Sequence, residues 1–83
     1  MWTLFISICS LGQCGWLEVQ QPTYQDIVSC ENSAHTIRVE LYTQLNDDRI
    51  QIRTECVGPE SLEQFRQDLL KDDRLTGRMT LTI

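Results

Sequence analysis

The sequence has no lysine or arginine in residues 1–35, and its seven basic residues lie later in the chain among acidic neighbours. Binding to a nucleic-acid backbone needs clustered cations, so we expect no direct contact with DNA or RNA. The twelve acidic residues give a net charge of -5. Such a surface suits a basic patch on a protein partner, including a patch that normally holds nucleic acid.

Long hydrophobic runs are also missing, and without about 18 consecutive apolar residues we expect no membrane span. The length of 83 residues predicts a single compact domain over 1–83. The apolar start, residues 1–9, lacks the positive charge of a secretory signal, and the small residues at 10–12 come too early for cleavage. We therefore predict that this segment stays as a strand of a cytoplasmic protein, with secretion as the alternative.

Groups for catalysis or metal binding are scarce. His35 is the only histidine, there is no Cys-x-x-Cys, and four glycines form no phosphate-binding loop. Cys30 and His35 are five residues apart, about 140° around a helix, so they do not face each other. The aspartate pairs at 47–48 and 72–73 lack the ligand spacing of a calcium loop. We expect a protein that is not an enzyme and that has no cofactor and no metal.

Alternation of apolar and polar residues predicts the strands. They span residues 2–9, 14–20, 50–56 and 79–83. Turn residues separate these strands from neighbouring elements, at 10–13, 46–48 and 72–77. The first two strands form a hairpin, because only the short turn that contains Gly12 joins them.

Helical spacing predicts the remaining elements. Thr23, with Asp26 three residues later, predicts a helix start. One apolar stripe continues from there to residue 45, through Ile27, Cys30, Ala34, Ile37, Leu41 and Leu45. Residues 36–43 also alternate as a strand would, and we prefer one long helix because its stripe is unbroken. A second helix follows Pro59, with Leu62, Phe65, Leu69 and Leu70 on its apolar face.

The order strand, strand, helix, strand, helix, strand predicts an α+β fold. We expect two layers, in which a four-stranded sheet carries both helices on one face. The segment 49–83 is long enough for a right-handed parallel crossover.

The four cysteines permit three pairings. If they are oxidised, we predict Cys9–Cys14 across the hairpin turn and Cys30–Cys56 between inward faces of the long helix and third strand. The second bridge would stabilise the fold by about 3 kcal/mol. The alternative is four reduced, half-buried thiols, which the lack of a secretory signal favours.

The cysteine-bearing segments resemble small uncharacterised phage or prophage proteins. The resemblance lies in Leu4-Phe5-Ile6-Ser7-Ile8-Cys9, in Gly12-Gln13-Cys14, and in Tyr24 and Cys30. Those proteins have a hydrophobic strand that ends in cysteine, a Gly-x-Cys turn, and a helix with another cysteine. The likeness covers about residues 3–56, and the part from Gly58 onward has no counterpart in it. It implies a phage accessory protein of unknown activity, in the cytoplasm of the host cell.

Together these features predict a non-enzymatic accessory factor that binds a protein and inhibits or redirects it through an acidic surface. A phage protein would act in this way on a host or defence protein. The predicted acidic contacts are Glu31, Glu40, Asp47, Asp48, Asp72 and Asp73. Trp2 and Trp16 lie on neighbouring strands and could form an aromatic patch, and Tyr42 is a further candidate. The alternatives are a homo-oligomer joined through the edge strand at 79–83 and a secreted module stapled by disulfides.

Overall fold

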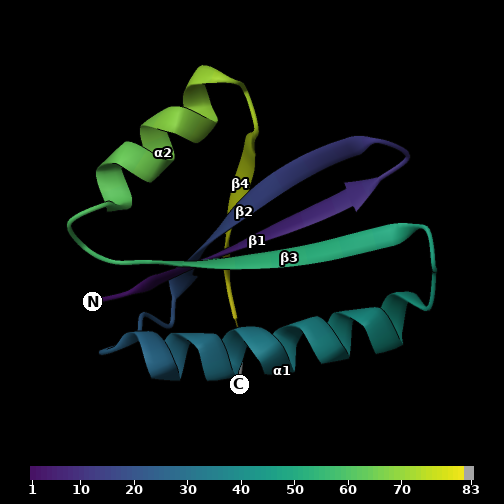
Figure 1. The fold of residues 1–83 in the computed structure, drawn as a ribbon, viewed down its shortest axis with the longest axis horizontal. Coiled ribbons are helices and arrows are strands. Elements are labelled where there is room, and N and C mark those ends of the chain that lie inside the picture. The colour runs from purple at the N-terminus through teal and green to yellow at the C-terminus, as the bar shows by residue number, and fades with distance from the viewer. Residues whose placement is uncertain (82–83) are drawn as a thin grey trace.

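The computed structural model describes residues 1–81 and confirms a small α+β fold (Figure 1). The elements are β1 (Thr3–Ser10), β2 (Gln13–Gln21), α1 (Ile27–Leu45), β3 (Ile50–Val57), α2 (Leu62–Lys71) and β4 (Leu75–Thr80). Their order is the predicted one.

The four strands form one mixed sheet in the order β3-β1-β2-β4. The first strand is therefore central, and it is antiparallel to both β2 and β3. Because β4 is parallel to β2, the three strands other than β1 all run in the same direction. The hairpin register pairs Cys9 with Cys14 and Phe5 with Glu18.

The two helices lie on opposite faces of this sheet, so the prediction that both pack on one face is wrong. Alternate residues of β1 point to different cores. Leu4 and Ile6 belong to the core that α1 covers, together with Cys30 and Ala34 of that helix. Phe5 belongs to a second core, which α2 covers. Figure 1 shows α2 above the sheet and α1 below it, which makes three layers in place of two.

The handedness of strand connections explains this arrangement. Helix α1 connects the parallel strands β2 and β3, and α2 connects β3 to β4. The first connection crosses the sheet in one direction, and the second crosses back over β1 and β2 to the other edge. Two crossovers of the same hand that run in opposite directions must lie on opposite faces. The sequence alone does not supply the strand order, so it could not predict that the two helices lie on opposite faces of the sheet.

Helix α1 is one continuous helix through residues 36–43, which confirms the helical interpretation over the strand. Its N-cap is Asp26, whose carboxylate accepts a 2.8 Å hydrogen bond from the Ser29 backbone N–H. The predicted start at Thr23 is therefore three residues early. This hydrogen bond stabilises the charged form and lowers the pKa of Asp26.

Two further boundaries differ from the prediction. Helix α2 begins at Leu62, because the segment that contains Pro59 forms a turn closed by a hydrogen bond from the Ser61 N–H to the Gly58 carbonyl. Strand β4 begins at Leu75, within the segment 72–77 that was expected to be a turn. This segment is a strand and not a turn because its residues pair with β2. The predicted strand end at 82–83 lies outside the described residues.

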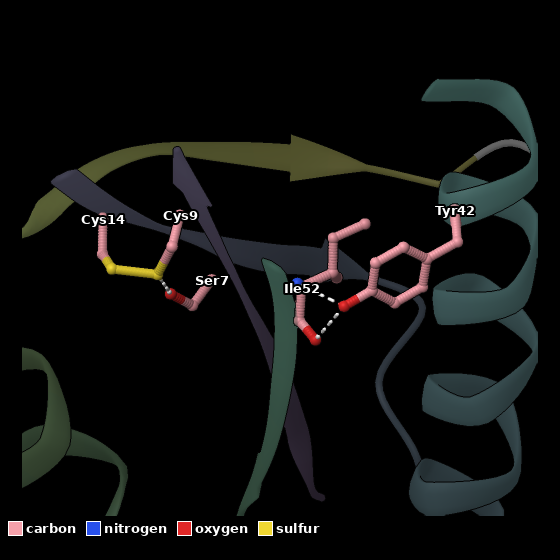
Figure 2. Close-up of a disulfide and its surroundings, with 5 residues drawn as sticks. All are labelled: Ser7, Cys9, Cys14, Tyr42 and Ile52. Atoms are coloured by element: carbon pink, nitrogen blue, oxygen red, sulfur yellow. Dashed lines mark hydrogen bonds between the residues drawn. A yellow bond between two sulfur atoms is a disulfide. The ribbon is translucent and has the colours of Figure 1, made fainter. Parts of the chain in front are cut away.

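The structure contains the two disulfides predicted for the oxidised chain. Cys9 and Cys14 lie opposite each other near the hairpin turn, with 4.0 Å between their Cα atoms (Figure 2). Cys30 of α1 and Cys56 of β3 form the second pair, with 6.1 Å between Cα atoms. The second bridge fastens the long helix to an edge strand.

Candidate protein-binding surface

Three of the predicted acidic contacts extend into solvent on the α1 side of the molecule. Glu31 and Glu40 are exposed on α1, and Asp48 is exposed in the following turn. They do not form one cluster. Glu31 lines a hollow against β3, whereas Glu40 lines a groove on the other flank of the helix, beside Tyr24 and Leu81.

Many of the cations that could offset these acids have a partner within the chain. The Arg38 guanidinium donates to the Thr54 hydroxyl. The other three pairs are Arg49 with Asp47, Arg66 with Glu18, and Arg74 with Asp72. Each of the three ion pairs cancels one acidic and one basic charge, so nine acidic residues remain against four basic ones, and Arg38 is one of those four because its hydroxyl partner is neutral.

Two predicted contacts, Asp47 and Asp72, have a neighbouring arginine as an internal partner. Asp47 accepts hydrogen bonds from the backbone N–H of Arg49 and from its guanidinium, at 2.9 and 3.1 Å. These bonds lower the pKa of Asp47. Asp72 lies 3.2 Å from Arg74. Both carboxylates lie in turns, and the neighbouring arginine partly offsets the negative charge of each in the unbound protein. Asp73 is exposed in the turn after α2, where its φ is 56°.

The predicted patch of two tryptophans does not form. Trp16 lies opposite Ser7 in the hairpin register, five residues along β1 from Trp2, which is roughly 16 Å for an extended strand. The two side chains also join different cores. Trp2 packs against the α1 core, and Trp16 packs edge-on against Phe65 of α2, with 5.7 Å between ring centroids. The expected patch ignored the side-chain alternation of paired strands.

Tyr42 has a structural partner that the sequence analysis missed. Its hydroxyl donates to the carbonyl of Ile52 at 3.4 Å and accepts from the Ile52 N–H at 2.7 Å (Figure 2). Both backbone groups belong to β3, which is an edge strand. Edge strands expose unpaired backbone groups that invite other strands. Tyr42 therefore covers part of this edge.

Replacing Tyr42 with phenylalanine should expose the Ile52 backbone groups while keeping the ring. We expect a loss of about 1 kcal/mol of stability and faster hydrogen exchange at the Ile52 amide. Exchange measured by NMR on the intact protein tests this. Unchanged protection at Ile52 would show that the hydroxyl does not cover the edge. Thr43→Ala serves as a control, because the Thr43 hydroxyl bonds only within α1.

Two hollows adjoin along the outer side of β3 and share Glu55 and Cys56. The first has a volume of about 300 Å³ and lies between β3 and the flank of α1 that carries Ile27, Glu31, Ala34 and Arg38. The second has a volume of about 480 Å³ and is lined mainly by apolar groups, including Trp2, Val57, Pro59 and Phe65. Glu60 also lines it. Both hollows are thus lined by acidic as well as apolar residues.

A buried ion pair joins β2 to α2. Glu18 is 2% exposed, and its two carboxylate oxygens accept hydrogen bonds from Arg66 at 2.8 and 2.6 Å. The Arg66 hydrogen bond is the main cause that lowers the pKa of Glu18, against the effect of burial. This pair is structural, and the sequence analysis missed it. The sequence gives no direct signal for it, because the second covered face that buries Glu18 follows from the strand order.

Among residues 1–81, no three His, Cys, Asp or Glu side chains gather in a way that could hold a metal ion. No helix in the described part of the chain is long and apolar enough to cross a membrane. No family model matches the chain, and neither do curated proteins or solved structures.

Proposed function

We propose that this chain is a non-enzymatic accessory factor that binds a basic surface of another protein. The observation that carries the proposal is the excess of carboxylates that remain without a paired cation. The pairs of Arg49, Arg66 and Arg74 cancel three acidic charges, which leaves nine acidic residues against four basic ones. Exposed carboxylates such as Glu31, Glu40, Asp48 and Asp73 are among those nine and contribute most of the field that a partner meets. Such a field steers a basic partner toward the molecule and sets the salt dependence of binding.

The mechanism that we propose is occlusion. A bound acidic domain of this size covers a basic surface and keeps its usual ligand away. The resemblance of residues 3–56 to small phage proteins supports a more specific version, in which the partner is a host or defence protein in the host cytoplasm. In that version the factor inhibits or redirects the partner without chemical modification.

A pull-down at low and high salt tests the electrostatic function. The immobilised protein is expected to retain its partner at 50 mM salt and to release most of it at 500 mM, since added salt shortens the Debye length severalfold. The triple variant Glu31→Gln, Glu40→Gln, Asp48→Asn should weaken capture at low salt. Asp47→Asn is the matched control, since Arg49 already offsets that carboxylate. Capture that is equally strong at both salt concentrations would contradict the proposal.

A second candidate function is a homo-oligomer joined through β4. This strand lies at the sheet edge opposite β3, and no side chain among residues 1–81 contacts its backbone in the way that Tyr42 contacts Ile52. Light scattering over a hundredfold range of concentration tests it. A constant monomer mass would exclude this candidate, and a mass that doubles with concentration would favour it.

A further inference from the structure

The outer edge of β3 is covered over only half of its length. The Ile52 backbone groups bind Tyr42 and therefore point away from β1. The Ile50 N–H also points outward and donates to the Asp47 carbonyl. Backbone groups alternate along a paired strand, so those of Thr54 and Cys56 point outward as well. Among residues 1–81 these groups have no hydrogen-bond partner. Each residue offers one N–H and one C=O.

The first hollow lies directly beside this open stretch. Its floor includes Thr54 and Cys56, and α1 forms its wall. The Cys30–Cys56 disulfide and the contact of Arg38 with Thr54 hold the wall against the strand. An open strand edge beside a fixed helix is the arrangement in which an extended peptide can add a strand to a sheet.

We propose that an extended segment of the partner protein adds as a strand to β3 at residues 54–56. This inference rests on the proposed protein-binding function and names the part of the partner that would be recognised. The segment carries a lysine or arginine beside an apolar residue. Its backbone pairs with the open groups of Thr54 and Cys56, and its side chains enter the two hollows.

The charges in the hollows select this chemistry. Thr54 and Cys56 point toward α1, so the side chain of Glu55 between them points away from α1, toward the second hollow. Glu60 lines the same hollow, so a basic side chain of the added strand meets two carboxylates there, whereas an acidic side chain would be repelled. In the first hollow Arg38 offsets the charge of Glu31, because a hydrogen bond to a neutral hydroxyl leaves the guanidinium charged. An apolar side chain next to the basic one enters the first hollow, beside Ile27 and Ala34.

Synthetic peptides test the site without knowledge of the partner. The probe is a seven-residue peptide that alternates lysine and valine, with acetylated and amidated ends. We expect it to shift the NMR signals of the Thr54 and Cys56 amides and to slow their exchange. A peptide with glutamate in place of lysine should bind more weakly. A lysine–valine peptide with alternate backbone nitrogens methylated should lose binding, because it cannot donate to the edge.

Two matched variants show which acidic side chain contributes to binding of the lysine–valine peptide. Glu55→Lys is expected to weaken the lysine–valine peptide by roughly threefold to tenfold, as the loss and reversal of a surface charge contact. Glu40→Lys makes the same charge change on the other flank of α1 and should weaken binding by less than twofold. Both side chains are exposed, so we expect each variant to fold, and thermal unfolding of each variant is the check.

Three results would overturn the proposed site. These are amide shifts confined to β4, equal weakening by Glu55→Lys and Glu40→Lys, and full binding of the methylated peptide. The site and the function can also fail separately. If a salt-sensitive partner binds Glu55→Lys as well as it binds the original chain, the edge site is wrong and the function stands. If the peptide binds the edge but capture is insensitive to salt, the edge site stands and the electrostatic function is wrong.

Discussion

Replacing Arg66 with alanine is expected to lower the free energy of unfolding by about 2–4 kcal/mol at neutral pH. The substitution leaves the Glu18 carboxylate without its two hydrogen-bond donors in a position where it is 2% exposed. We place the value below that of a fully buried pair, because the Arg66 side chain is 30% exposed and water can reach its place. Denaturant unfolding with both disulfides intact measures the loss.

The loss should depend on pH in a defined direction. Arg66 lowers the pKa of Glu18 below its ordinary value of 4.5. A carboxyl with a depressed pKa stabilises the fold fully above the unfolded pKa, and this contribution is lost as pH falls through the folded pKa. The difference between the original chain and Arg66→Ala is therefore largest near neutral pH and shrinks below about pH 4. A difference that grows in acid would contradict the assignment.

Two companion variants separate the ion pair from general effects of truncation. Arg49→Ala removes an arginine from an exposed pair with Asp47, where solvent screens the charges, so it should cost much less stability than Arg66→Ala. The double variant Glu18→Leu, Arg66→Leu removes both charges and should recover much of the lost stability. If Arg66→Ala is no more harmful than Arg49→Ala, the buried pair does not stabilise the fold.

The sequence predicted the elements of this fold better than their arrangement in space. Alternation in β1 and β3 and the stripe of α1 are local signals, and each gave an element of the right kind. The placement of α2 depends on strand order, which depends on pairings between distant segments. The pair of Glu18 with Arg66 is equally non-local, since 48 residues separate its members. Both errors come from the same missing information.

The candidate surface was predicted unevenly for a related reason. Exposure of Glu31 and Glu40 follows from their positions off the apolar stripe of α1. The pairing of Asp47 with Arg49 depends on the turn, and the role of Tyr42 depends on the β3 edge. The open backbone groups of Thr54 and Cys56 cannot be predicted from residue type, because every residue other than proline has the same backbone N–H and C=O. The residue types therefore predict the acidic contacts but not the open strand edge beside them.

Removing the Cys30–Cys56 disulfide should have an effect of similar size. The chain-entropy model gives about 3–4 kcal/mol for a bridge between residues 26 apart. We expect Cys30→Ala, Cys56→Ala to lose this much in denaturant unfolding. We also expect faster hydrogen exchange in the first half of α1, because the bridge fixes that part of the helix to β3. The intact mass of the oxidised chain should lie about four hydrogens below that of the reduced chain.

The hairpin disulfide provides the control. Cys9 and Cys14 are only 5 residues apart, so the same model gives about 2 kcal/mol for Cys9→Ala, Cys14→Ala. That variant should leave exchange in α1 unchanged. Equal losses from the two double variants, with no local change in α1, would contradict the role given to the Cys30–Cys56 bridge.

Because the apolar residues are divided between two faces of the sheet, substitutions on one face can accumulate during evolution with little effect on the other. Ile52 and Leu4 pack under α1, whereas Val57 and Phe5 pack under α2, and the sheet lies between them. Substitutions far apart and without shared neighbours combine additively in their effects on stability. Selection can therefore alter the α2 face without repacking the face that carries α1 and Glu31. The sheet makes the molecule modular, and its strands link the two halves, because each of them carries residues of both cores.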